Sequence, residues 1–142
     1  MIDIHAHILP GMDDGAEDLI DTLEMARIAV ENGISTMVAT PHCNIPGIYD
    51  NYFDYKFQET YERVCNALEA EEIPLQLLRG MEVFATPDLP QLLAEGKLLT
   101  LNDSRYLLVE FPFEEDLDYV EEILTAILDA GLLPVIALAE RY

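Results

Sequence analysis

Two of the three histidines in this chain lie two residues apart near its beginning, at His5 and His7. They follow a short apolar run, and if that run forms a β-strand, residues two apart point to the same side of it. A turn at Pro10-Gly11 then leads to Asp14, whose carboxylate the turn can fold back toward the histidines. Two imidazoles and a carboxylate can begin a divalent-metal site. The alternative is that both histidines belong to a solvated chain end.

More ligand-type residues follow later apolar runs. His42, Glu82 and Glu110 each come at or just after the end of such a run. In parallel α/β folds the carboxyl ends of the strands meet at one edge, where active sites lie. A single glutamate after a strand is usually a cap or a solvated loop residue. The repetition at successive strands favours one shared metal site that also includes His5 and His7.

The expected ligands are histidines and carboxylates, which favour a catalytic Mn, Fe or Zn ion over a structural zinc. A carboxylate such as Glu82 can bridge two ions, and clustered ions support phosphoester hydrolysis. Arg141 would add a bidentate phosphate contact if it lies near the site, and is otherwise a surface arginine. Neither Cys43 nor Cys65 is followed six residues later by the arginine of a cysteine-phosphatase loop, and no GxSxG, GxxxxGK[ST] or GxGxxG motif occurs.

The residues that must position this site alternate between strand and helix patterns. The strand patterns are short apolar runs, and the helix patterns carry apolar residues at helical spacing. This alternation predicts an α/β fold with a parallel sheet covered by helices. We expect strands at residues 1–4, 34–39, 75–78, 106–109 and 132–137, and helices at 17–32, 53–72, 87–95 and 117–130.

The length of 142 residues suits one domain. Acidic residues number 28 against 7 basic ones, and a net charge of −21 argues against nucleic acid or anionic lipid as a partner. No apolar stretch approaches the ~18 residues of a membrane span, and the first residues lack a signal-peptide pattern. We therefore expect a cytoplasmic protein without membrane insertion, whose two cysteines are reduced thiols.

Five segments carry motifs of a known family: MIDIHAHILPGMDDGAED, ATPHC, RGMEVF, LLVEFPF and PVIALAERY. In this order they resemble the bacterial CpsB/YwqE-type metal-dependent tyrosine phosphatases of the polymerase-and-histidinol-phosphatase (PHP) superfamily. The resemblance implies a distorted seven-stranded parallel β/α barrel that holds up to three metal ions, usually manganese (Mn²⁺). It also implies dephosphorylation of tyrosine kinases that control capsule or exopolysaccharide synthesis.

The resemblance assigns each ligand-type residue to one of three ions. It also matches Arg141 to the arginine that contacts the substrate phosphate. The implied ligands are His5, His7 and Glu82 for the first ion, Asp14 and His42 for the second, and Glu82, as a bridge, and Glu110 for the third.

The chain departs from the family pattern in three places. Cys43 replaces the second histidine of TPHH, and Leu138, which cannot bind a metal, stands where the third ion's histidine belongs. The family's later Asp-x-His pair has no counterpart in this sequence. About five strands cannot close a seven-stranded barrel, so we expect residues 1–142 to be a single PHP-like domain truncated at its C-terminal side, with an open sheet edge.

Three hypotheses follow. The first is a metal-dependent protein-tyrosine phosphatase whose partner is a phosphotyrosine protein, namely a bacterial tyrosine kinase. The second is another PHP phosphoesterase, acting on histidinol phosphate or a similar small ester. The third is a non-catalytic module that binds a kinase or another barrel half, which Leu138 and the missing strands favour. A homo-oligomer stays open under each of them. Metal content and turnover would separate the catalytic hypotheses from the third.

Overall fold

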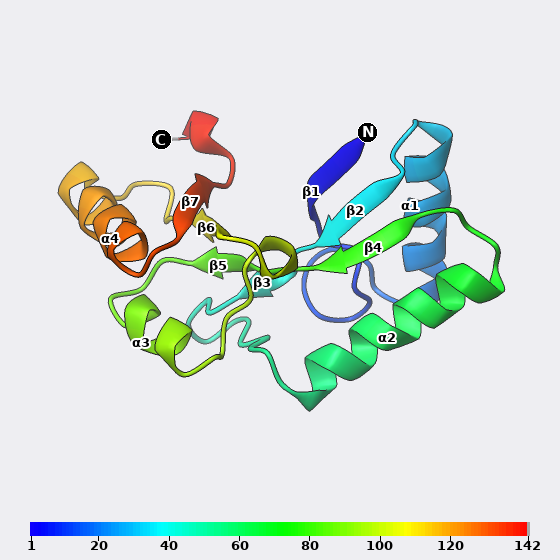
Figure 1. Ribbon diagram of the computed structural model, residues 1–142, viewed down its shortest axis with the longest axis horizontal. Coiled ribbons are helices and arrows are strands. Elements are labelled where there is room, and N and C mark those ends of the chain that lie inside the picture. Colours follow the sequence, from blue (N-terminus) through cyan, green and yellow to red (C-terminus); the bar gives the residue numbers. More distant parts are fainter. Residues whose placement is uncertain (142) are drawn as a thin grey trace.

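The computed structural model describes the backbone of residues 1–141 and the side chains of residues 1–140, and its strands and helices alternate along the chain (Figure 1). The elements are β1 (Ile2–Ala6), α1 (Leu19–Glu31), β2 (Thr36–Ala39), β3 (His42–Cys43), α2 (Tyr55–Ala70), β4 (Gln76–Arg79), β5 (Glu82–Phe84), α3 (Leu89–Ala94), the short 3₁₀ helix η1 (Leu101–Asp103), β6 (Tyr106–Glu110), α4 (Leu117–Asp129), β7 (Leu133–Ile136) and η2 (Ala139–Arg141).

Aspartates begin the three longest helices. The side chains of Asp18, Asp54 and Asp116 each accept a hydrogen bond from a backbone N–H in the first turn of α1, α2 and α4. A negative charge at this end also interacts favourably with the helix dipole, so part of the acidic excess stabilises helix starts. Gly33 and Gly131 follow α1 and α4 with φ angles of 85° and 82°, the left-handed conformation in which helices commonly end.

Every strand pair is parallel, in two sheets with the orders β1-β2-β4 and β3-β5-β6-β7. The strands expected at residues 34–39 and 75–78 are β2 and β4. Each is followed by a short strand, β3 or β5, that was not expected from the sequence. The backbone ladder continues between the sheets, because Gly80 N donates to Ala39 O at 2.9 Å and Glu82 N donates to Pro41 O at 3.1 Å. The chain therefore has five parallel strand segments in sequential order, two of them bent, which confirms the expected α/β fold.

The bends correct the expected placement of two ligand-type residues. His42 and Glu82 lie inside the short strands β3 and β5, where they are paired with each other, and do not simply follow a strand. Pro41 has no N–H to donate, which interrupts the regular ladder on one bent strand. Gly80, on the other, lies so close to neighbouring side chains that a Cβ atom would come within 3.0 Å of Val38.

Apolar side chains are buried on both faces of the strands, which is why the strands read as nearly continuous apolar runs. The larger core lies between sheet and helices and includes Phe57 of α2, Leu107 of β6 and Ile127 of α4. Figure 1 shows α1 and α2 beside β2 and β4, and α3 and α4 beside β5, β6 and β7. The opposite face carries a small cluster of Val38, Leu101, Leu108 and Ala137.

Strands β1 and β7 stand at the two ends of the strand order. Within residues 1–141, no strand pairs with the outer edge of either one. Ile2 and Ile4 of β1 are 64% and 45% exposed, although both are large apolar residues. Parallel strands in sequential order with unpaired ends form an incomplete, barrel-like arrangement. None of the described helices is long and apolar enough to cross a membrane.

Candidate metal centre

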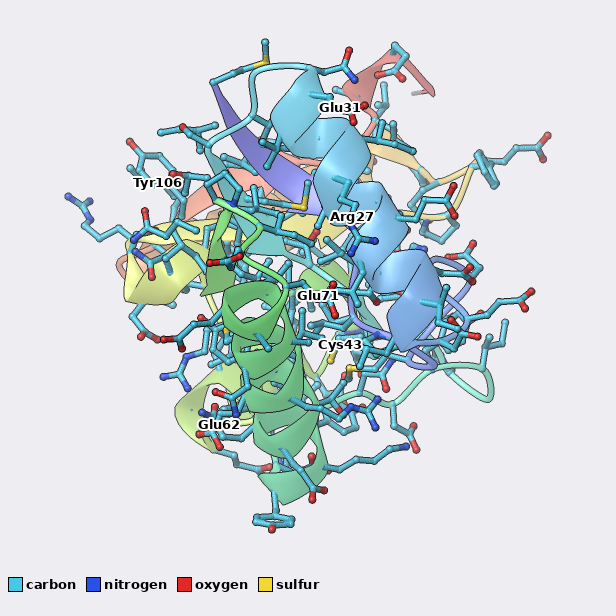
Figure 2. All side chains as sticks on the ribbon, turned by 90° about the vertical axis from the view of Figure 1, so that its right-hand side faces the viewer. Arg27, Glu31, Cys43, Glu62, Glu71 and Tyr106 are labelled. Carbon is cyan, nitrogen blue, oxygen red and sulfur yellow. The ribbon has the colours of Figure 1, made fainter. Side chains whose placement is uncertain are left out.

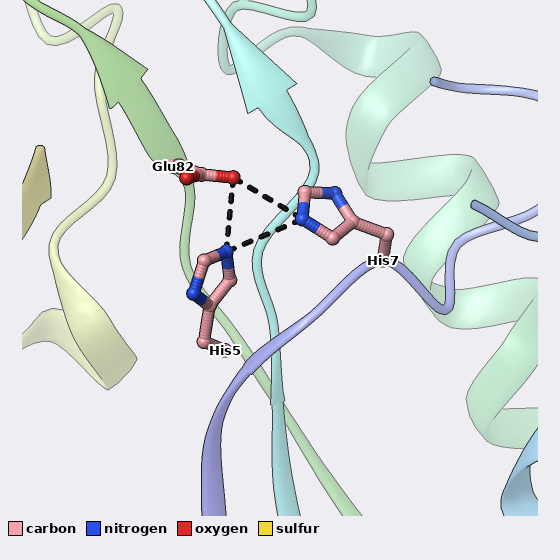
Figure 3. A group of neighbouring side chains, drawn as sticks. All are labelled: His5, His7 and Glu82. Carbon is pink, nitrogen blue, oxygen red and sulfur yellow. Dashed lines mark hydrogen bonds and ion pairs between the residues drawn. The ribbon is translucent and has the colours of Figure 1, made fainter. Parts of the chain in front are cut away.

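The beginning of the chain brings two imidazoles together as the spacing predicts. His5 lies in β1 and His7 follows it, and their Nε2 atoms are 3.2 Å apart. The two rings are tilted by 57° and do not stack face to face. Their Nε2 atoms point toward a common position (Figure 3). Strand alternation therefore places both side chains on one side, as expected from the sequence.

Glu82 lies at the centre of the cluster, from the neighbouring strand β5 (Figure 3). Its Oε2 atom is 2.9 Å from His5 Nε2, 3.1 Å from His7 Nε2 and 3.3 Å from His42 Nδ1. The side chain is only 2% exposed, yet Oε2 makes no hydrogen bond to any residue that the structure describes.

This arrangement is a test of whether a metal ion fits the site. A buried acceptor without a hydrogen bond is costly, and proteins rarely leave one unsatisfied. A divalent cation among these atoms would interact with the carboxylate oxygen and with the nitrogen lone pairs together. The chemistry of the donor set, imidazole and carboxylate, agrees with such an ion.

The remaining ligand-type residues extend the cluster around His42. Its Nδ1 atom lies 2.7 Å from Glu110 Oε1, and its Nε2 atom lies 3.5 Å from Asp14 Oδ1. Within each of three overlapping groups, ligand atoms lie within 4.8 Å of one another. Groups that share residues are what a site for several ions requires. The groups are His5, His7 and Glu82; His7, Asp14 and His42; and His42, Glu82 and Glu110.

Leu138 lies beside the third group. It follows β7 and lines a cavity of about 200 Å³ together with Glu82 and Glu110. Its φ of 50° is uncommon for a leucine, and such backbone conformations cluster at functional positions. The structure thus brings a side chain that cannot bind metal next to two carboxylates. The side chain of Arg141 lies outside the described residues, so its phosphate contact stays a prediction.

Asp13 is a residue of this site to which the sequence analysis gave no role. Its side chain is fully buried, whereas that of Asp14 is 69% exposed. It lies 2.7 Å from His7 Nδ1, and its two oxygens accept backbone hydrogen bonds from His42 and Gly15. The available signal was the pair of adjacent carboxylates after a turn, of which the sequence analysis used only Asp14.

The charges of the cluster shift its pKa values strongly. Burial alone would lower the pKa of His7, but its hydrogen bond to Asp13 and the nearby negative charges of Asp13 and Glu82 raise it to about 10. Burial alone would raise the pKa of Glu82, but the imidazoles of His5 and His7 hold it at about 2. Burial likewise opposes the charge on His42, yet Glu110 raises its pKa. The site therefore favours positive charge, which a bound cation would also supply.

The loop after β3 makes hydrogen bonds and a ring contact with the site. The side chain of Asn51 donates to Met12 O at 2.7 Å and to His42 O at 2.9 Å, which joins the loop after β1 to strand β3. The ring of Tyr49 stacks on His42 with 5.8 Å between centroids and 4° between planes. These contacts restrict how His42 can turn.

Comparisons with known proteins show what the whole chain is similar to. The family model described as "Capsular polysaccharide synthesis, CpsB/CapC" matches residues 1–142. Tyrosine-protein phosphatase YwqE of Bacillus subtilis is 46% identical over 141 residues, which is 99% of this chain and 55% of that protein. Tyrosine-protein phosphatase CpsB of Streptococcus pneumoniae is 32% identical over 142 residues, all of this chain and 58% of that protein.

A solved structure is also similar. It comes from work on YwqE of Bacillus subtilis and CpsB of Streptococcus pneumoniae, described as unique metal-dependent tyrosine phosphatases, and superimposes with a TM-score of 0.91 at 46% identity. The match covers 99% of this chain and 56% of that one. The chain thus spans about half the length of the relatives it matches.

Proposed function

The chain belongs to the CpsB/CapC family of capsular polysaccharide synthesis proteins, and on this premise we propose that it supplies the metal-binding part of a metal-dependent protein-tyrosine phosphatase. The carrying observation is the buried Oε2 atom of Glu82, which has three imidazole nitrogens within 3.3 Å and makes no hydrogen bond to a described residue. The names of the relatives support phosphotyrosine as the substrate.

The residues have separable roles in this proposal. His5, His7 and Glu82 would hold one ion, Asp14 and His42 would hold a second, and Glu82 and Glu110 would contribute to a third. Bound divalent ions supply Lewis-acid activation of water and neutralise the phosphate charge. Asp14 is the most exposed of these side chains, so the substrate phosphate approaches from its side. Arg141 orients the phosphate oxygens through its guanidinium group.

We further propose Mn²⁺ as the physiological ion, with Fe or Zn as alternatives. Carboxylates and imidazoles suit all three, so the ligand set alone does not select among them. The third position, beside Glu110, would hold an ion weakly, because Leu138 supplies no metal ligand there. The phosphotyrosine protein is a bacterial tyrosine kinase of capsule or exopolysaccharide synthesis. The cytoplasmic location stays a prediction of the sequence.

The fold supports a proposal about the domain as well. We propose that residues 1–142 form the N-terminal part of a PHP-type β/α barrel, and that further strands complete it between β7 and β1. The unpaired outer edges of these strands and the exposed Ile2 and Ile4 are the features that such strands would cover. Relatives of nearly twice the length contain enough additional chain for this.

The test measures metal content and turnover on one sample. The purified chain is loaded with Mn²⁺, its metal is quantified by elemental analysis, and hydrolysis of a phosphotyrosine peptide is followed. We expect at least two ions per chain and their loss in Glu82→Gln, which keeps the size of the side chain. Glu95→Gln is the matched control, because Glu95 pairs with Lys97 at the surface. Absence of bound metal in the wild-type chain would overturn the proposal.

Two further measurements separate the alternatives. Faster hydrolysis of histidinol phosphate than of the phosphotyrosine peptide would favour the small-ester phosphoesterase. Adding the C-terminal remainder of Bacillus subtilis YwqE tests barrel completion, and we expect it to raise turnover. Bound metal without turnover, both alone and with this remainder, would favour the non-catalytic module, in agreement with Leu138 at the third position.

A further inference from the structure

Asp13 lies behind the metal-ligand cluster and joins three segments of the chain. Its Oδ2 atom is 2.7 Å from His7 Nδ1 and accepts a hydrogen bond from the backbone N–H of His42 at 2.9 Å. Its Oδ1 atom accepts from the backbone N–H of Gly15 at 3.0 Å. The carboxylate is completely buried, and these three donors account for its position.

The short contact to Nδ1 has a consequence for His7. An ionised carboxylate can only accept hydrogen bonds, so a close contact of this kind requires the proton of the ring to be on Nδ1. The lone pair of a neutral imidazole is then on Nε2, the atom that lies 3.1 Å from Glu82 Oε2 and 3.2 Å from His5 Nε2. The carboxylate therefore selects the tautomer in which His7 can bind a metal through Nε2.

The backbone hydrogen bonds of Asp13 add a second effect. The N–H of His42 donates to the same oxygen as His7, so one carboxylate fixes the start of β3 relative to the loop after β1. These segments are 29 residues apart in the sequence at their point of contact. The position of His42, from which Nε2 faces Asp14, thus depends on the side chain that also orients His7.

We propose that Asp13 is a positioning residue for the metal centre, which holds His7 as the Nδ1–H tautomer and fixes His42 beside it without binding the metal itself. This inference rests on the metal site proposed above. Outer carboxylates that orient a ligating imidazole typically change metal affinity 10- to 100-fold when they are removed. A purely structural carboxylate would change stability and leave the state of the His7 ring unaffected.

The experiment compares the whole 142-residue chain with Asp13→Asn and Asp13→Ala. The affinity for Zn²⁺, a diamagnetic probe, is measured by calorimetric titration. The imidazole N–H protons of the zinc-loaded, ¹⁵N-labelled proteins are observed by NMR. In the wild type we expect a slowly exchanging, low-field Nδ1–H signal from His7. In both variants we expect this signal to be lost and the affinity to fall by about 10- to 100-fold.

Asp3→Asn is the matched control. Asp3 also accepts a backbone hydrogen bond, from His5 N at 3.1 Å, and its substitution removes one negative charge from β1, the strand that carries His5. We expect this variant to bind Zn²⁺ within threefold of the wild type. Circular dichroism and thermal melting establish that each variant is folded, and Asp13→Asn carries the test if Asp13→Ala does not fold, because it preserves the side-chain size.

Each outcome decides the inference. Loss of affinity together with loss of the His7 signal in a folded variant supports it. Wild-type affinity in Asp13→Asn overturns it, as does reduced affinity with an unchanged His7 signal, which would give Asp13 another role. If the wild-type chain binds neither Zn²⁺ nor Mn²⁺, the proposed metal site fails, and this inference fails with it. If the wild type binds metal and the Asp13 variants bind it equally well, only the inference about Asp13 fails and the proposed metal site remains.

Discussion

Gly15 is the residue at which the loop after β1 depends most directly on the absence of a side chain. A Cβ atom at this position would lie 2.1 Å from the carbonyl oxygen of His7 and 2.4 Å from the Cβ of His7. Ordinary contacts of a Cβ atom begin at 3.4 Å, so Gly15→Ala requires a displacement of about 3.4 − 2.1 = 1.3 Å. The obstructing atoms are backbone and Cβ, which cannot rotate away.

The expected magnitude follows from what His7 contacts. Its carbonyl accepts the N–H of Ala16 at 3.1 Å, and its ring lies 2.7 Å from Asp13 and 3.1 Å from Glu82. A displacement of about 1 Å exceeds the ~0.2 Å within which metal–ligand distances are held. We expect Gly15→Ala to lose about 1–3 kcal/mol of stability through overpacking and to bind metal at least about tenfold more weakly.

The assay combines thermal melting of the metal-free chain with calorimetric titration of Mn²⁺. For a chain of this length, the stability loss corresponds to a melting temperature lower by about 3–10 °C. Gly96→Ala is the control, because Gly96 has a φ of 70° and nothing within 4 Å of the added Cβ. Its left-handed backbone makes alanine unfavourable by ~1–2 kcal/mol, so it should destabilise the chain and leave the metal affinity unchanged.

The two variants together separate stability from site geometry. If Gly15→Ala melts and binds Mn²⁺ like the wild type, the loop can relax around a methyl group and the reasoning is refuted. If both variants weaken metal binding equally, the affinity follows global stability and the position of His7 has no special importance.

Three further predictions concern other parts of the molecule. Leu138→His adds a donor to the cavity beside the site, so elemental analysis should find more bound Mn²⁺ per chain; an unchanged content would contradict the role given to this cavity. Tyr61→Phe removes a 2.8 Å hydrogen bond to Leu77 O and should cost ~1 kcal/mol at pH 8 in urea unfolding. Burial raises the pKa of Tyr61 to about 12, above its ordinary value near 10. The stability that the neutral hydroxyl contributes is therefore complete below pH ~10, and it is lost as the pH rises through 12. Arg27→Ala breaks the ion pair between Arg27 and Glu71, two half-exposed side chains on the surface where α1 and α2 meet (Figure 2). In urea unfolding we expect a stability loss of no more than ~1 kcal/mol, and a smaller one in 1 M NaCl. A larger loss would mean that the pair is not a simple surface contact.

Local patterns were sufficient for the helices and for the general position of the ligands. The helix periodicity and the following glycines place α1 and α4 within one or two residues of their expected ends. Helix starts and ends depend on side chains close in sequence, which a linear reading contains. His5 and His7 lie together for the same reason, because the alternation of a strand is a local property.

The sequence analysis missed the short strands β3 and β5 for a physical reason. The expected strands before them ended at residues 39 and 78, because strand propensity does not contain the direction in which a sheet bends and continues. The bends arise where Gly80 packs against Val38 and where Pro41 cannot donate to a ladder. These are contacts with other strands, so they exist only once the sheet is assembled.

The sequence by itself determined that the chain is an α/β protein of parallel strands and that histidines and carboxylates recur at the strand ends. Hydrophobic periodicity and the topology of parallel sheets are sufficient for both conclusions. Only the tertiary structure decided that Glu82 Oε2 is buried without a hydrogen bond, that Asp13 and not Asp14 lies against His7, and that β1 and β7 keep unpaired edges within the described residues. Burial, hydrogen-bond direction and edge pairing depend on residues tens of positions apart, and folding alone brings those residues into contact.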